Sequence, residues 1–291
     1  MIDLHCHSTA SDGSDRPAEL VAKAAATGLS AMAITDHDTT AGWQEAAAAV
    51  ARLDEALVLI PGAEFSCVYQ GPAGERISLH LLGYLFDPAA RGLRAERDRL
   101  RTDRFGRGEA IVGNLSNAGY PIQWQRVREI AAGGTVGRPH IGQALVEAGV
   151  VGSVDEAFAE LLADDSPYYV PKADAEVHRM ISLITEAGGV PVIAHPWARR
   201  RGPILGPDAL VELAGSGLAG IEVDHLDHSE QDRAELRKLA SQYGLIATGS
   251  SDYHGDRKAV KLGAETTNPQ SLREILSLAS GMEPIYSSSA R

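Results

Sequence analysis

Short apolar runs rich in β-branched residues recur along this chain and predict seven β-strands. Most are separated by segments in which alanine and leucine recur at three- and four-residue spacing, which is typical of amphipathic helices. The predicted strands cover residues 2–7, 31–35, 57–66, 77–86, 190–195, 220–225 and 245–253, and the predicted helices cover 17–28, 42–53, 175–189, 207–217 and 229–244. Strands that alternate with helices indicate parallel βαβ units, in an open sheet or a barrel.

Two segments depart from this alternation. Residues 68–76, between the third and fourth predicted strands, are too few for a crossover helix, so these two strands are expected to form a β-hairpin. Residues 98–171 show helical periods and few convincing strands. We therefore expect the first part of a barrel over 1–97, a helical, substrate-capping insertion over 98–171, and the second part of the barrel over 172–291.

Polar side chains that can bind metals gather where the predicted strands end. In parallel α/β folds these carboxyl ends meet at one face, where functional sites form. Any one histidine could be an ordinary core or surface residue, but recurrence at strand after strand favours a shared site. His178 and His228 lie on or near helices and are left out. The candidate metal ligands are His5, His7, Asp12, His37, Glu64, His80, His195, Asp252 and His254.

Nine candidate ligands are too many for one ion, so two or three divalent ions are expected, with a carboxylate that bridges a pair. Imidazole and carboxylate ligands without thiolate suit manganese, iron or zinc. We take Mn²⁺ as the first choice, with Fe²⁺ or Zn²⁺ as alternatives. Cys6 alternates to the opposite face from His5 and His7 and is read as a packing residue.

Composition narrows the class of protein. The 291 residues are 44% hydrophobic and 23% charged, which is ordinary for a globular chain, and the formal net charge is -12. This charge argues against a nucleic-acid coat or membrane-surface protein, but an anionic substrate stays possible because bound cations invert the local field. Two cysteines are too few for a disulfide framework, and no apolar run approaches membrane-spanning length. A cytoplasmic protein with no charged-then-apolar leader is expected.

Five segments carry a family resemblance: DLHCHSTASDG, ITDHD, PGAEFS, IAHP and SSDYHG. In this order they resemble the successive motifs of the polymerase and histidinol phosphatase (PHP) superfamily. The resemblance implies an α/β fold, a distorted seven-stranded (βα)7 barrel, with a two- or three-metal site that cleaves phosphate esters by attack of a metal-bridging hydroxide. It implies that the nine residues above are ligands, with Glu64 as the bridge. His37, Glu64 and His254 are the expected catalytic residues, and His37 or His254 is a candidate to protonate the leaving oxygen.

Further segments resemble a stand-alone branch of that superfamily: GRPHI (137–141), YYVPK (168–172), AHPW (194–197) and EVDH (222–225). That branch contains 3',5'-nucleotide bisphosphate phosphatases and short-RNA 5'-3' exonucleases. The expected reaction is therefore hydrolysis of the 3'-phosphate of a nucleoside 3',5'-bisphosphate, such as adenosine 3',5'-bisphosphate to AMP. The alternatives are a 5'-3' exoribonuclease on short 5'-phosphorylated RNA, a histidinol-phosphate phosphatase, and a non-enzymatic metal-dependent scaffold or sensor. No obligate protein partner is implied.

A bisphosphate needs a second anion site away from the metals. Arg138 and Arg199 are the preferred pair because arginine binds phosphate with two parallel hydrogen bonds. The arginine-rich run 91–107 is interleaved with acids and predicts a salt-bridged helix face rather than an RNA track. Candidates to stack a base are Trp197, Tyr168 and Tyr169. The full set of expected substrate-binding residues is Arg138, His140, Lys172, Arg199 and His225.

Overall fold

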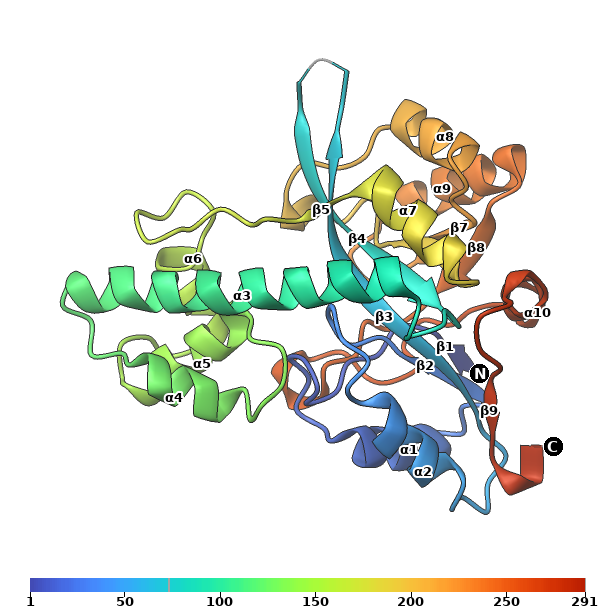
Figure 1. The fold of residues 1–291 in the computed structure, drawn as a ribbon, viewed down its shortest axis with the longest axis horizontal. Coiled ribbons are helices and arrows are strands. Elements are labelled where there is room, and N and C mark those ends of the chain that lie inside the picture. The colour runs from blue at the N-terminus through green and yellow to red at the C-terminus, as the bar shows by residue number, and fades with distance from the viewer. Residues whose placement is uncertain (73, 291) are drawn as a thin grey trace.

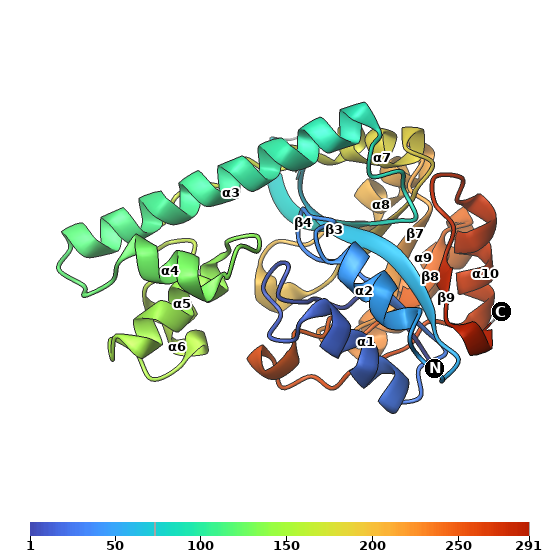
Figure 2. The same cartoon turned by 60° about the horizontal axis from the view of Figure 1, so that its bottom comes forward.

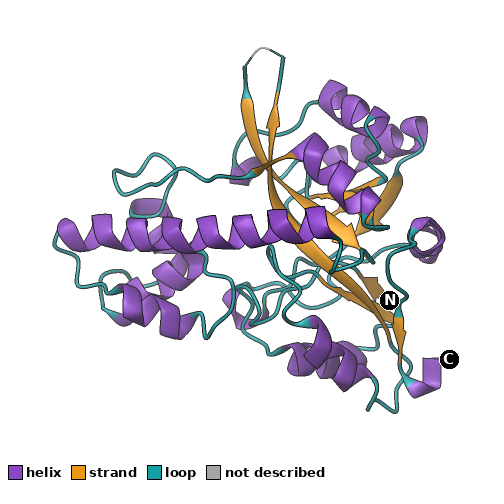
Figure 3. Cartoon of the chain, viewed as in Figure 1, coloured by secondary structure: helices purple, strands orange, loops and turns teal. Residues whose placement is uncertain are grey.

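A curved β-sheet forms the centre of the computed structural model, which describes residues 1–72 and 74–290, and helices pack around the sheet (Figures 1 and 3). The strands are β1 (Ile2–Asp3), β2 (Ala31–Ile34), β3 (Val58–Gln70), β4 (Arg76–Tyr84), β5 (Ala175–Glu176), β6 (Val190–Ala194), β7 (Gly220–Asp224), β8 (Ile246–Gly249) and β9 (Ile285–Tyr286). The main path through the sheet is β1-β2-β3-β4-β6-β7-β8, while β5 and β9 pair with β3. This is the barrel-shaped α/β fold that the sequence predicts.

The length of β3 and β4 explains why two candidate ligands, Glu64 and His80, lie within strands. β3 and β4 form the predicted hairpin, and β4 also runs antiparallel to β6. The other neighbouring pairs on the main path are parallel. His80 therefore lies in the middle of β4, opposite Ser66 of β3 and Ala194 of β6. Because β4 extends beyond Ala194, the last residue of β6, its middle and not its first residue lies level with the carboxyl ends of the parallel strands.

The first and last predicted strands are shorter than expected. β1 ends at Asp3 and β8 at Gly249, yet the following residues stay paired across the two ends of the chain. Cys6 and Tyr253 form a parallel bridge, and the His7 N–H donates to the Tyr253 carbonyl at 2.8 Å. Asp252 has a left-handed φ of 52°, which interrupts regular strand pairing there. This contact brings the start of the barrel against its end.

Ten helices are described around and beside the sheet, several with the helix-end residues the sequence indicates, such as Pro17 at the first turn of α1. Ser229 and Asp232 form a capping box on α9. The helices are α1 (Pro17–Ala26), α2 (Trp43–Val50), α3 (Arg91–Asn117), α4 (Trp124–Ile130), α5 (Arg138–Glu147), α6 (Val154–Glu160), α7 (Val177–Glu186), α8 (Pro207–Gly215), α9 (Glu230–Tyr243) and α10 (Pro269–Leu278). Among the described residues, none of these helices has the length and apolarity needed to cross a membrane.

The helices α4, α5 and α6 stand beside the barrel and are joined to it by the long helix α3 (Figure 2). They pack with α3 around their own hydrophobic cluster, which includes Ile111, Leu115, Ile141 and Leu145. α3 starts at Arg91, before the expected boundary at 98, because its first turns pack on α7 of the barrel. The division of the chain into three segments stays a prediction. Along α3, Arg99 pairs with both Glu96 and Asp103, as the interleaved charges indicate.

Two further hydrophobic clusters cover the two faces of the sheet. Alternate residues of each strand divide between them: Met32 and Ile34 join the cluster that includes α1, α2 and α7, whereas Ala31 and Ala33 join the one that includes α10. This period of two is what strand geometry dictates. The rigid sheet that results positions the polar loops at its end.

Candidate metal centre

Six segments from distant parts of the chain bring buried histidines and carboxylates together at one end of the barrel. They are the residues after β1, β2, β6 and β8, together with Glu64 inside β3 and His80 inside β4. All nine sequence-predicted ligands lie here, and all except the partly exposed His80 are buried. Three overlapping groups of side chains present their nitrogen and oxygen atoms to common points.

The first group is built on the His-x-His pair. His5 Nε2 lies 3.1 Å from His7 Nε2, and these atoms lie 3.3 and 3.2 Å from Glu64 Oε2. Asp252 Oδ1 lies 3.5 Å from both nitrogens. Ligands bonded to one ion at about 2.1 Å, with angles of about 90–109°, lie roughly 3.0–3.4 Å apart. The spacing of His5, His7 and Glu64 therefore fits a single ion, and Asp252 lies slightly farther out.

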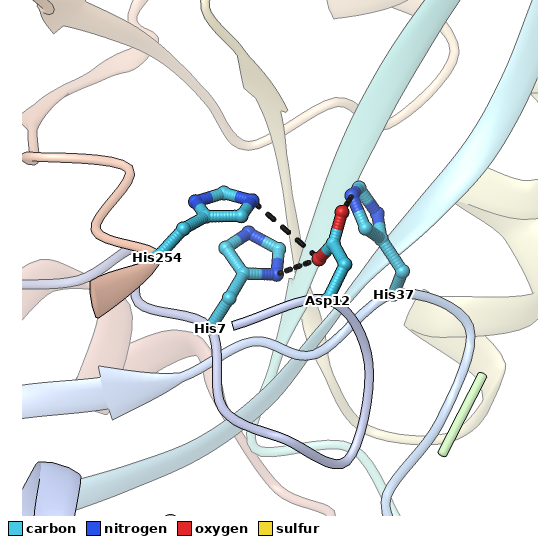
Figure 4. A group of neighbouring side chains, drawn as sticks. All are labelled: His7, Asp12, His37 and His254. Atoms are coloured by element: carbon cyan, nitrogen blue, oxygen red, sulfur yellow. Dashed lines mark ion pairs between the residues drawn. The ribbon is translucent and has the colours of Figure 1, made fainter. Parts of the chain in front are cut away.

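The second group surrounds Asp12 with three imidazole rings (Figure 4). Asp12 Oδ1 lies 3.7 Å from His7 Nδ1 and 3.5 Å from His254 Nε2, and its other oxygen lies 3.7 Å from His37 Nε2. His7 presents its second ring nitrogen to this group, so it takes part in two groups at once. Histidines and one carboxylate at this spacing make a second candidate ion site.

The third group shares Glu64 with the first. Glu64 Oε1 lies 2.7 Å from His80 Nδ1 and 3.2 Å from His195 Nε2, and Oε2 lies 3.0 Å from His37 Nδ1. His37 Nδ1 and His80 Nδ1 nevertheless have no hydrogen-bond partner among the described residues, although both atoms are buried. Both nitrogens lie close to the Glu64 carboxylate but are not aligned for a hydrogen bond with it. This arrangement is expected where the lone pairs of nitrogen and oxygen point at one cation. The residues present thus fit two or three divalent ions, and Glu64 belongs to two of the three groups.

Burial and neighbouring charges set up the ring nitrogens as ligands. Burial lowers the pKa of His254 to about 3, with help from His7 and Lys258, so this ring is neutral near pH 7. Burial also holds the pKa of His37 well below its usual range. His7 differs: burial lowers its pKa, but Asp252 and Glu64 raise it to about 9. The buried carboxylates around His7 therefore require a positive charge, which a metal ion can supply in place of a proton.

Glu222, on β7, contacts the ligand cluster, and the sequence reasoning did not include it among the candidate residues. One oxygen contacts His5 Nδ1 at 3.2 Å, and the other accepts a hydrogen bond from the His195 backbone N–H at 2.8 Å. Burial by itself raises the pKa of Glu222. The neighbouring histidines, His5 first among them, act in the opposite direction and together bring this pKa down to about 2. The ionised carboxylate thus directs His5 Nε2 toward the ion site, as carboxylates behind metal-bound histidines do. A glutamate between the apolar residues Ile221 and Val223 of the strand sequence GIEVD was the available signal.

Two aspartates beside His37 hold the loops that carry ligands. Asp36 accepts hydrogen bonds from the Ser8 N–H and Oγ at 2.8 and 2.7 Å and from Ser11 Oγ at 2.6 Å, so it fixes the loop before Asp12. Asp38 accepts from the Ser66 N–H at 3.0 Å and pairs with Arg104 of α3. The sequence ITDHD placed both acids next to a ligand, but their partners are far away along the chain.

A cavity of about 1160 Å³ opens over this centre. Metal-site residues, including Asp12, His37 and His195, form one side, and residues of α5 and α6, including Gln143 and Phe158, form the other. The cationic side chains that line it are Arg138, Lys172, Arg200, Arg257 and Lys258. Outside the candidate ligands, the lining carries these five cations and the three acids Asp155, Asp164 and Asp256, an excess of positive charge that suits an anionic substrate in a chain whose net charge is negative.

Two of the five expected substrate-binding residues line this cavity. Arg138 Nη1 donates to the Leu162 carbonyl at 2.6 Å and to Asp164 at 2.5 Å. Lys172 lines the cavity where the insertion returns to the barrel. Burial lowers the pKa of Lys172, and the guanidiniums of Arg104, Arg138 and Arg107 lower it further, against the opposing effect of Asp174. Its charge is therefore incompletely compensated.

The other three expected substrate-binding residues do not line the cavity in the described part of the structure. Arg199 pairs with Asp232 at 2.8 Å and lies over Trp197, and the neighbouring Arg200 lines the cavity instead. His140 is buried and its Nδ1 accepts a hydrogen bond from the Gly137 N–H at 3.0 Å. His225 lies beneath the centre, with Nε2 at 3.7 Å from Asp252 Oδ2.

The three candidate stacking aromatics have packing partners. The Trp197 indole is buried and donates to the Leu205 carbonyl at 2.8 Å. Tyr168 packs edge-on against Tyr120, and Tyr169 lies beneath the Arg107 guanidinium. Cys6 is fully buried in the hydrophobic cluster, in line with its reading as a packing residue.

Comparison with known proteins identifies close similarities. A PHP domain model matches residues 3–131. The chain is 33% identical to the 5'-3' exoribonuclease Rnm of Salmonella typhimurium, over 92% of this chain and 89% of that protein. It is also 33% identical to the 3',5'-nucleoside bisphosphate phosphatase of Chromobacterium violaceum, over 87% of each. A crystal structure from Bifidobacterium adolescentis, assigned as a metal-dependent phosphoesterase, superimposes with a TM-score of 0.89 at 35% identity and covers 96% of both chains.

Proposed function

The chain belongs to the PHP domain family and is a metal-dependent phosphoesterase, and we propose that it removes the 3'-phosphate of nucleoside 3',5'-bisphosphates. The arrangement of the cavity supports this substrate class. The metal-ligand cluster lies on one side, and Arg138 and Lys172 lie on the insertion and its return. A molecule with two phosphate groups can place one at the ions and the other at these cations. Such a molecule satisfies both charged surfaces at once.

Two or three divalent ions are the cofactor that this donor set fits, with Mn²⁺ as the first candidate and Fe²⁺ or Zn²⁺ as alternatives. Bound ions of this kind stabilise charge on phosphoryl oxygens and make hydroxide available near neutral pH. Glu64 would hold ions of two groups, since its two oxygens face His7 and His80, and Glu222 would direct His5 toward one of them. Of the residues expected to be catalytic, His37 and His254 both have lowered pKa values, which favours neutral ligands over proton donors.

The distal phosphate would meet a partly preformed site. Arg138 already pairs with Asp164, an exposed carboxylate on the cavity wall, so an incoming phosphate competes with a well-solvated partner. Lys172 offers a half-buried ammonium whose pKa three guanidiniums lower, so a bound anion would relieve this repulsion. Arg200, rather than Arg199, supplies the third cation that we assign to this group.

A second candidate activity is 5'-3' hydrolysis of short 5'-phosphorylated RNA. The cavity volume of about 1160 Å³ favours it, because pockets for one small ligand usually measure about 300–1,000 Å³. The same cations would hold the terminal 5'-phosphate while the next phosphodiester lies at the ions. The relative from Salmonella typhimurium is named for this type of reaction.

Product analysis distinguishes these activities. Protein loaded with Mn²⁺ is incubated with adenosine 3',5'-bisphosphate, a 5'-phosphorylated RNA trinucleotide or histidinol phosphate, and products are separated by chromatography. We expect AMP and phosphate from the bisphosphate, and no turnover by Glu64→Gln. Release of adenosine 3'-phosphate would reverse the assignment of the two phosphate sites. Faster cleavage of the RNA or of histidinol phosphate would replace the proposed substrate, and failure to cleave any phosphoester would leave the scaffold or sensor reading.

A further inference from the structure

Arg257 is a cationic residue at the metal centre that none of the motifs includes. It ends the short turn Gly255–Arg257, directly after the candidate ligand His254, and it lines the cavity. Its Nη1 is buried without a hydrogen-bond partner, and no ion pair of its guanidinium is found among residues 1–72 and 74–290. The next residue is different, because Lys258 Nζ contacts Asp252 Oδ2 at 2.8 Å. Arg257 is thus a half-buried positive charge without a partner.

An unpaired, partly buried guanidinium needs a reason, since protein interiors usually pair such charges. Burial lowers the pKa of Arg257, and Asp12 is the carboxylate that opposes this effect. Asp12 is also the carboxylate at the middle of the second ligand group. Arg257 therefore lies within electrostatic reach of the metal end of the cavity. An anion held at this end would supply the missing partner.

We propose that Arg257 binds the phosphate group that is cleaved, while Arg138 and Lys172 bind the distal one. The guanidinium donates hydrogen bonds to non-bridging oxygens of the reacting phosphate, and its planar fork suits two of them. Its charge also stabilises the negative charge that these oxygens carry in the transition state. The inference rests on the proposed function only in assigning which phosphate reacts, because any phosphoester cleaved at this centre would present the same oxygens.

A purely structural role is the competing explanation. Arg257 lies near the boundary between the barrel and the insertion, since its charge acts on His140 at the start of α5. A guanidinium that only packed there would contribute to folding or to the shape of the Asp12 loop. It would not change the affinity for a small anion once the metals are bound. Equilibrium binding of phosphate therefore separates the two roles.

The test is calorimetric titration of inorganic phosphate into Mn²⁺-loaded wild-type protein, Arg257→Ala, Arg257→Lys and Arg273→Ala. Arg273 is an exposed arginine on α10 and controls for the loss of one charge. We expect Arg257→Ala to bind phosphate about 10- to 150-fold more weakly, the worth of a charge-assisted hydrogen bond. Arg257→Lys keeps the positive charge but loses the planar guanidinium, so its affinity for phosphate should lie between those of wild type and Arg257→Ala. Arg273→Ala should bind phosphate as tightly as wild type.

Kinetics then identify which phosphate is involved. Arg257→Ala should lower kcat/KM by the same factor on adenosine 3',5'-bisphosphate and on adenosine 3'-phosphate, because both present the reacting group. Loss confined to the bisphosphate would overturn the proposal in favour of a distal contact. Unchanged phosphate affinity, or loss of metal from both Arg257 variants in elemental analysis, would also overturn it.

Failure of the proposed function would look different. In that case wild-type protein would release no phosphate from adenosine 3',5'-bisphosphate, yet it would still bind inorganic phosphate. The titration alone would then decide the role of Arg257. The two hypotheses can therefore fail independently.

Discussion

Arg104 offers the sharpest test of how the insertion is tied to the metal centre. It lies on α3, and its guanidinium pairs with the fully buried Asp38 and donates to Ser66 Oγ at 2.6 Å. Asp38 follows the candidate ligand His37, and Ser66 lies two residues after Glu64. One arginine of the insertion thus supports both ligand-bearing segments.

Replacing Arg104 by methionine keeps much of the side-chain volume but leaves the Asp38 carboxylate buried without its counter-ion. Removing one partner of a buried ion pair costs about 3–5 kcal/mol, and we take the lower end, about 3 kcal/mol, because Arg104 keeps 21% exposure. Asp38→Asn removes the charge instead. Asparagine tolerates the left-handed φ of 53° at this position, and its amide oxygen can still accept from the Ser66 N–H.

The assay is urea unfolding of the metal-free protein for wild type, both single variants and the double variant. We expect the free energy of unfolding to fall by about 3 kcal/mol in Arg104→Met and to recover by about 1.5–3 kcal/mol when Asp38→Asn is added, because contacting residues couple by this much. Metal titration should show weaker binding in Arg104→Met than in the double variant. A loss below about 1 kcal/mol, or strictly additive single effects, would refute the reasoning.

Further predictions concern the centre, the distal phosphate and pH. Elemental analysis should find more than one divalent ion per chain, and one or fewer would contradict the grouping of ligands. Glu222→Gln should weaken metal binding about 10- to 100-fold in competition with a chelator, since it loosens His5; unchanged affinity would remove its positioning role. Arg138→Ala should lower kcat/KM about 10- to 150-fold on adenosine 3',5'-bisphosphate but hardly on adenosine 3'-phosphate, and equal losses would mean that it serves the chemistry or the fold. Burial by itself lowers the pKa of His178. Glu176 and Glu212 together have the larger, opposite effect, so the pKa in the folded protein lies above the unfolded value. The ion pairs of protonated His178 therefore stabilise the fold fully below about pH 6.5, and this stabilisation is lost as pH rises through the raised pKa of the folded state. Because the pairs are exposed, their contribution to the free energy of unfolding is well under about 1 kcal/mol. The difference in urea stability between wild type and His178→Asn should shrink from pH 6 to pH 9, and a constant difference would count against the ion pair.

The local pattern of the sequence was enough to predict most elements and to name the nine side chains that the structure gathers at one end of the barrel. Periods of two and of about 3.6 residues reflect which side of a strand or helix is buried, and that information is written in neighbouring positions. The short connection 68–76 was likewise enough to predict the β3–β4 hairpin. The His-x-His pair and the histidines and acids at strand ends followed from the rule that strand ends gather at one face.

Tertiary structure alone decided which of these groups work together. His7 meets His254 and Asp252 only because the two ends of the chain pair through Cys6 and Tyr253. Glu222 behind His5 and Arg104 against Asp38 depend on contacts between residues 217 and 66 positions apart.

The placement of the cations shows the same limit. From sequence, Arg199 and Arg138 were equal candidates, but Arg199 found Asp232 while Arg200 and Arg257 reached the cavity. Which of several arginines stays unpaired depends on the positions of all neighbouring acids, and these are set by the packing of the barrel and the insertion. Local sequence determines which chemical groups a loop carries, whereas long-range packing determines what each group meets.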